Sequence, residues 1–76
     1  MKPVSYSVTR IGDAWSVRCS HELGVSSSHG SRGAALLAAE QGALVMWKDH
    51  GAACRVLISD DDGRWLPVAE FGQMLG

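Results

Sequence analysis

Apolar and polar residues alternate in the first quarter of the chain. The alternation runs from Val4 to Ile11 and resumes from Ala14 to Cys19. A period of two residues is typical of a strand with one buried face. Gly12 and Asp13, which separate the two runs, are typical turn residues. The sequence therefore predicts a β-hairpin whose core-facing residues are Val4, Tyr6, Val8, Trp15, Val17 and Cys19.

A run of strong helix formers, rich in alanine and leucine, extends from Ser31 to Gly51. Ser31 is expected to cap the start of this helix and Gly51 to end it in a left-handed conformation. Gly42 costs about 1 kcal/mol relative to alanine in a helix. We therefore expect the helix backbone to approach the sheet closely at Gly42. The predicted sheet-facing stripe contains Ala35, Leu36, Ala39, Gly42, Ala43, Met46 and Trp47, with His50 at its end.

The opposite side of this helix is also partly apolar, because Leu37 and Leu44 lie there beside Lys48. A helix with apolar residues on both sides is usually buried on both sides. A chain of 76 residues has a small core and gains stability from a partner. The sequence therefore predicts a homodimer, with a contact surface of Leu37, Leu44, Lys48 and Trp65.

A second pair of strands is predicted after the helix, over residues 53–59 and 64–69, joined by a turn at 60–63. Pro67 has no N–H group to donate, which favours a place at the edge of the sheet. Residues 70–76 have little pattern and are predicted to be a tail. Residues 20–30 are rich in serine, glycine and histidine and predict a flexible loop.

The predicted order of elements is strand, strand, helix, strand, strand. This order indicates a single α+β domain over residues 1–76, with a core over about 4–69 and one helix packed on a four-stranded, mainly antiparallel sheet. A crossover from the second to the third strand favours the spatial order 2-1-3-4.

Four short motifs resemble a family of small bacterial domains of unknown function. They are a W-x-V hairpin at Trp15-Ser-Val17, an alanine-rich helix from Ser31, a V-x-I strand at Val56-Leu-Ile58 and a D-G-R turn at Asp62-Gly-Arg64. The resemblance covers about residues 8 to 65 and implies the fold, since the family has no established activity. The chain departs from it in a longer Ser/His loop and tryptophan-rich ends. A second resemblance, in topology, is to antitoxin domains, and it implies a toxin partner.

Charge argues against strong binding of nucleic acid. Seven Lys and Arg residues face eight Asp and Glu residues, a formal net charge of −1, whereas phosphate binding requires a local basic excess. A weak nucleic-acid-binding surface is the alternative that the strand pattern leaves open. It would use Arg10, Arg18 and Arg55 on the open face of the sheet.

The candidate metal ligands are Cys19, His21, His50 and Cys54. Zinc takes four such ligands, but their spacing is unlike that of common zinc sites. Both cysteines occupy apolar strand positions, which favours simple packing. We therefore expect no metal and no cofactor. A serine beside His29 lacks a marked orienting group or oxyanion hole, so we expect no enzyme activity.

No stretch of the sequence is apolar and long enough for a membrane span, and the N-terminus lacks the core of a signal peptide. We therefore expect a cytoplasmic protein with reduced cysteines and no membrane partner. Together these patterns predict a small binding domain, homodimeric and acting as an accessory or regulatory protein. The alternatives are the weak nucleic-acid binder and the antitoxin-like partner.

Overall fold

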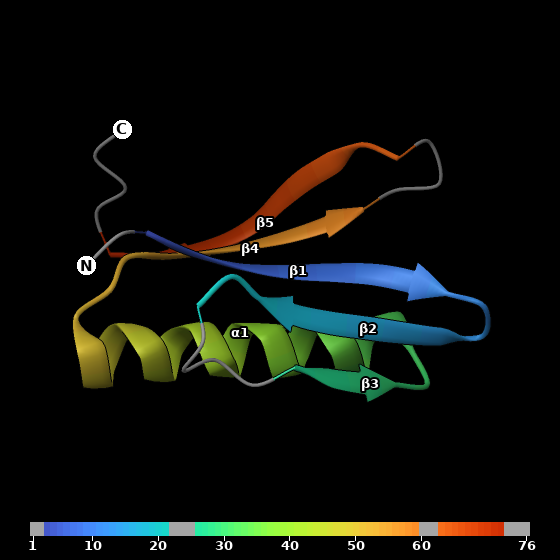
Figure 1. The fold of residues 1–76 in the computed structure, drawn as a ribbon, viewed down its shortest axis with the longest axis horizontal. Coiled ribbons are helices and arrows are strands. Elements are labelled where there is room, and N and C mark those ends of the chain that lie inside the picture. The colour runs from blue at the N-terminus through green and yellow to red at the C-terminus, as the bar shows by residue number, and fades with distance from the viewer. Residues whose placement is uncertain (1–2, 22–25, 60–62, 73–76) are drawn as a thin grey trace.

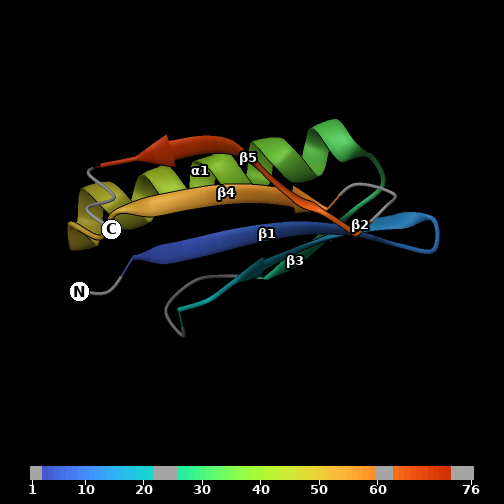
Figure 2. The same cartoon turned by 90° about the horizontal axis from the view of Figure 1, so that it is seen from above.

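The computed structural model describes residues 3–21, 26–59 and 63–72. They form a two-layer fold in which one helix lies against one face of a five-stranded sheet (Figure 1). The strand order is β3-β2-β1-β4-β5. Figure 2 shows the helix on one side of the sheet only. The elements are β1 (Val4–Ile11), β2 (Ala14–Cys19), β3 (Ser27–His29), α1 (Arg32–His50), β4 (Cys54–Ser59) and β5 (Trp65–Phe71).

The α+β class and the order of the four predicted strands are confirmed, because β2, β1, β4 and β5 are neighbours in that sequence. The prediction of four strands in a mainly antiparallel sheet was wrong in detail. A fifth strand, β3, pairs with β2, and the central pair β1–β4 is parallel, so the sheet is mixed. The cause is the direction of the chain. β3 runs in the same direction as β1, and α1 then returns the chain to the end of the sheet where β1 begins, so β4 runs parallel to β1.

Two boundary predictions were also wrong. Part of the loop predicted over 20–30 is the strand β3, whose backbone pairs with β2. The last strand continues through Glu70 and Phe71, which the sequence assigned to the tail, since Phe71 pairs with Cys54. The predicted turn residues 60–62 and the end of the tail, 73–76, lie outside the described residues.

The ends of α1 form as the sequence predicts. The Ser31 hydroxyl accepts a hydrogen bond from the backbone N–H of Ala34 at 3.2 Å. Gly51 has a φ of 66° and donates its N–H to the carbonyl of Trp47 at 2.9 Å. These two caps satisfy backbone groups that the helix itself leaves unpaired, and so define its length.

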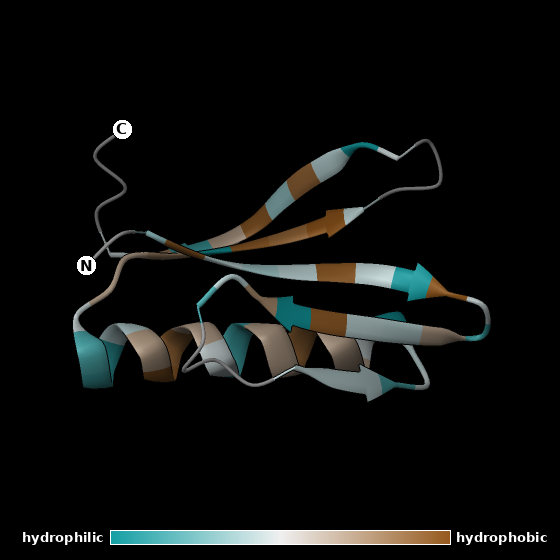
Figure 3. Cartoon of the chain, viewed as in Figure 1, coloured by the Kyte–Doolittle hydropathy of each residue, from teal (hydrophilic) through white to brown (hydrophobic). Residues whose placement is uncertain are grey.

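The core lies between α1 and the three central strands, and Figure 3 shows the alternation of hydrophobic and hydrophilic residues along the strands that produces it. The helix presents only small or flexible side chains to the sheet. The predicted stripe is confirmed at Ala35, Ala39, Ala43 and Met46, which are all buried. Trp47 remains 38% exposed, but its ring lies against Gly72, which directly follows β5, as the stripe predicts. His50 is exposed, so its assignment to the end of the stripe was wrong. The buried strand residues are Val4, Tyr6, Val8, Val17, Cys54, Val56 and Ile58.

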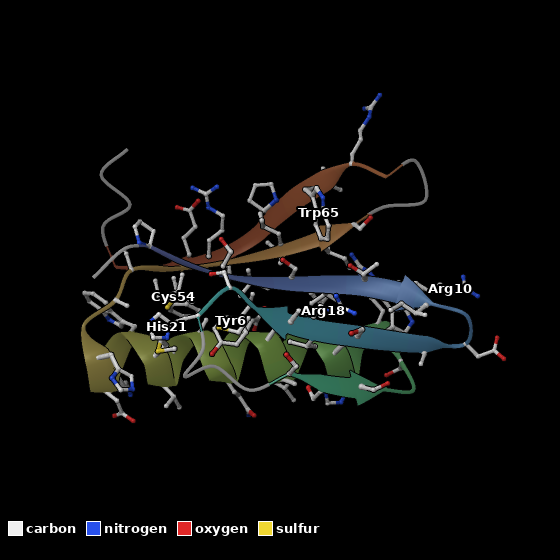
Figure 4. The ribbon with its side chains drawn as sticks, viewed as in Figure 1. Tyr6, Arg10, Arg18, His21, Cys54 and Trp65 are labelled. Atoms are coloured by element: carbon white, nitrogen blue, oxygen red, sulfur yellow. The ribbon has the colours of Figure 1, made fainter. Side chains whose placement is uncertain are left out.

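Gly42 allows α1 to lie directly on the ring of Tyr6. A Cβ atom at Gly42 would be 2.8 Å from Cε2 of Tyr6, closer than such atoms approach in folded proteins. The expectation of a close approach at this glycine is therefore confirmed. Tyr6 lies at the centre of the sheet on β1, beneath the helix (Figure 4).

Pro67 lies in β5, which forms one edge of the sheet, as predicted. The register of β5 on β4 shifts between Val56 and Leu57, so β5 contains a bulge around Val68. Bulges increase the local twist of a strand. In Figure 1, β5 rises away from α1, and its side chains are consequently little covered by the helix.

Candidate binding surfaces

The edge strand β5 is the most exposed apolar element of the described chain. Trp65, Leu66 and Val68 are 49%, 46% and 41% exposed. An edge strand also presents unpaired backbone N–H and C=O groups, which can pair with another strand. The strand is seven residues long, so these two properties coincide over a stretch long enough to form a ladder.

The outer side of α1 is a second, separate apolar surface. Leu37 is 56% exposed and Val45 is 55% exposed. Leu44 is half-buried and Lys48 is exposed. The structure therefore confirms that apolar residues remain on this side of the helix.

The four residues predicted as one contact surface do not lie together. Leu37, Leu44 and Lys48 lie on the outer side of α1. Trp65 lies in the sheet, at the start of β5, where it pairs with Ser59 of β4 (Figure 4). Sequence reasoning also missed Leu66, Val68 and Val45. The exposure of Leu66 and Val68 results from the twist of the strand and from the bulge, and neither can be predicted from the local sequence pattern.

The face of the sheet opposite α1 is rich in hydroxyl groups. No described element covers this open face in either view of the fold (Figure 2). Its residues are those that alternate with the core positions in each strand. By register they are Ser5, Ser7, Thr9, Ile11, Ala14, Ser16, Arg18, Ser28, Arg55, Leu57, Ser59, Trp65, Pro67 and Glu70.

Two of the three arginines predicted for this open face lie on it. Arg18 is opposite Ser7, and Arg55 lies between Ser5 and Glu70. Arg10 is opposite Trp15, on the side of the core residues, and its Nε donates to the carbonyl of Gly12 at 3.1 Å. Grouping Arg10 with the other two was therefore wrong.

The side-chain Nε of Arg55 is buried and has no hydrogen-bond partner. Arg55 is half-buried among the short side chains of the open face. A buried donor without a partner is uncommon and carries a free-energy cost. The open face therefore contains a cationic group with unused hydrogen-bonding capacity.

The four candidate metal ligands, which the sequence analysis did not expect to bind metal, lie apart. Cys19 lies on β2 and Cys54 on β4, with β1 between them. Two strand spacings are about 10 Å, too far for a disulfide between these residues. His50 is exposed at the end of α1. Within the described ranges, no three His, Cys, Asp or Glu side chains are placed to hold a metal ion.

Both thiols have local hydrogen bonds. The backbone N–H of His21 donates to Sγ of Cys19 at 3.4 Å, and the Cys54 thiol donates to the carbonyl of Ala52 at 3.2 Å. Burial raises the pKa of the Cys54 thiol. Burial, together with a hydrogen bond to Cys19, raises the pKa of the Tyr6 hydroxyl well above its usual range. The Cys54 thiol and the Tyr6 hydroxyl are therefore held in their neutral forms at ordinary pH.

A hydroxyl–imidazole pair occurs on β3, where Oγ of Ser27 lies 2.7 Å from Nε2 of His29. Both residues are half-buried, and they lie on the same side of a three-residue strand. A nucleophilic serine also needs an orienting group for the imidazole and oxyanion donors. The hydrogen bond alone accounts for a local link within β3.

No family model, curated protein or solved structure is significantly similar to this chain. The described part of the chain contains no helix that is both long and apolar enough to cross a membrane.

Proposed function

We propose that this chain is a small protein-interaction domain that acts as a homodimer, with two copies joined through β5. The observation that carries this proposal is the exposed edge strand itself, with Trp65, Leu66 and Val68 all more than 40% exposed. Such a domain acts as an accessory or regulatory protein rather than as a catalyst.

Pairing of two β5 strands would address two costs at once. It would satisfy outward-facing backbone groups and remove apolar side chains from water. A two-fold axis between the copies uses the same surface twice, so one exposed edge is sufficient. Pro67 contributes no N–H group, so the hydrogen bonds of the new ladder would come from the residues on either side of it.

The outer side of α1 is the competing dimer surface, because Leu37 and Val45 are also exposed there. It offers apolar contact alone, whereas β5 offers apolar contact and backbone pairing. The same edge strand would also accept a strand from a different protein, which is how an antitoxin-like domain would hold its toxin.

The test combines native mass spectrometry with light scattering over a range of protein concentrations. We expect a dimer for the wild type. In the Leu66→Lys/Val68→Lys variant, which places charges on β5, the dissociation constant of the dimer should rise at least tenfold, so that the monomer predominates. Ile11→Lys is the control: Ile11 is 55% exposed but lies on β1, which β4 separates from β5.

A dimer lost on Leu37→Glu/Leu44→Glu but kept in the β5 variant would place the interface on α1. A wild-type monomer at all concentrations would refute the homodimer. A monomer that nonetheless binds one protein from its host through β5 would favour the antitoxin-like alternative.

A further inference from the structure

We infer that the open face of the sheet is a weak binding surface for single-stranded nucleic acid, with Arg18 and Arg55 as phosphate contacts. This inference does not require the β5 dimer, although Trp65 belongs to both surfaces. It starts from the open face as a whole, which carries short hydroxyl side chains on β1, β2, β3 and β4. A flat surface of this kind admits an extended strand across it.

The charges of the described residues are divided between the surfaces of the molecule. Arg18 and Arg55 lie on the open face, where the one carboxylate among the described residues is Glu70. The other described acids lie elsewhere: Asp13 in the hairpin turn, and Glu40 and Asp49 on α1. Among the described residues, the open face therefore carries two arginines against one carboxylate, and this small positive excess is complementary to phosphate.

Arg55 carries the second part of the argument. Glu70 is its cross-strand neighbour, yet Nε of Arg55 has no partner. A guanidinium donates from a planar fork that fits a phosphate with two hydrogen bonds. Because Nε itself is buried, a phosphate over the open face would be contacted by the terminal Nη groups of Arg55.

The spacing of the two arginines suits a chain of phosphates. They lie on strands separated by β1 and two residues apart along the strand direction, which corresponds to about 12 Å between their Cα atoms. Ser5 and Ser7, on β1 between them, can donate to phosphate oxygens. A single strand could therefore cross the sheet from β2 to β4.

Trp65 lies on the same face, at the β5 edge, and is 49% exposed. Exposed aromatic rings next to a basic path are how proteins stack unpaired bases, and this stacking favours a single strand over a duplex. With two arginines, the binding should be weak and salt-dependent. The logarithm of the association constant should fall against the logarithm of salt concentration with a slope of about −1.4.

The experiment is fluorescence anisotropy of a fluorescein-labelled 15-mer of deoxythymidine, titrated with the full chain at 25, 50, 100 and 200 mM NaCl. We expect saturable binding at 25 mM and the shallow salt dependence given above. Arg18→Gln/Arg55→Gln should weaken binding at least tenfold. Arg10→Gln is the matched control, because Arg10 lies on the other side of the sheet, and it should bind as the wild type does.

Thermal unfolding monitored by circular dichroism checks that the variants are folded, and Arg55→Lys, which keeps the charge, should recover part of the binding. No binding at 25 mM NaCl with 100 μM protein would overturn the inference. So would an equal loss in Arg10→Gln, or binding of heparin with none of the oligonucleotide. The Leu66→Lys/Val68→Lys variant should retain binding, which separates this surface from the dimer.

Discussion

The two faces of the sheet differ in composition and in what they are free to do, although they alternate along the same strands. On β1, Val4, Tyr6 and Val8 are at most 3% exposed beneath α1. Ser5 and Ser7, one residue away, lie half-buried on the open face. The difference arises because α1 covers one face of the sheet, whereas no described element covers the other. One face carries most of the stability of a small domain, and the other can vary or bind with little effect on it.

The strongest test of this comparison uses two neighbouring apolar residues of β4. Ile58→Ala removes a buried side chain beneath α1, which should reduce the free energy of unfolding by about 2–5 kcal/mol. Leu57→Ala, on the open face, should cost no more than about 1 kcal/mol. Urea unfolding followed by circular dichroism measures both. Equal losses would mean that the open face is also part of a packed layer.

The contact between α1 and Tyr6 provides the next test. Gly42→Ala gains helix propensity but places a Cβ atom 2.8 Å from the Tyr6 ring. We expect a net loss of about 1–2 kcal/mol, because overpacking exceeds the gain. Gly33→Ala is the control: it lies in the same helix with nothing within 4 Å of its Cβ position, and it should be neutral or stabilising. Destabilisation by Gly33→Ala alone would contradict the close approach.

The third test uses pH, and it concerns the buried Tyr6 hydroxyl. Its pKa is raised in the folded state, so the neutral form is favoured there. The unfolded chain ionises above its ordinary pKa of ~10, and the stabilisation is therefore present below pH 10 and lost as pH rises above it. At pH 10.5 this one group should cost about 1 kcal/mol.

Urea unfolding at pH 8, 9.5 and 10.5 measures this loss. Tyr6→Phe should show a shallower fall in stability between pH 9.5 and 10.5 than the wild type. Cys54 retains a fall of the same sign in both proteins, because its pKa is also raised. Identical slopes in the two proteins would show that the Tyr6 hydroxyl does not remain neutral in the folded state.

The covered face could be predicted from the sequence because it is coded locally. Alternation on β1, β2 and β4 identifies the core residues, and the caps at Ser31 and Gly51 mark the helix. The strand β3 could not be predicted in this way, since Ser27–His29 contains no apolar residue. Its backbone pairing with β2 is a tertiary interaction that has no signature in side-chain pattern.

The candidate surfaces were only partly predictable for a similar reason. Arg10 follows Val8 by two residues, so parity alone places it on the side of the core; this signal was present and was overlooked. The exposure of Leu66 and Val68 depends on a bulge and on the twist that lifts β5 from the helix. Both are properties of the assembled sheet.

The parallel pair at the centre of the sheet has a consequence for the rate of folding. The strands of each hairpin, β1–β2 and β4–β5, are close in the sequence. Val4 and Cys54, which pair between β1 and β4, are instead separated by most of the chain. Such long-range pairing carries a large loop-closure entropy before any contact compensates for it. We expect the joining of the two hairpins, with α1 laid across them, to form the transition state. Substitutions at Val8 or Val56, which lie where the two hairpins join, should then slow refolding.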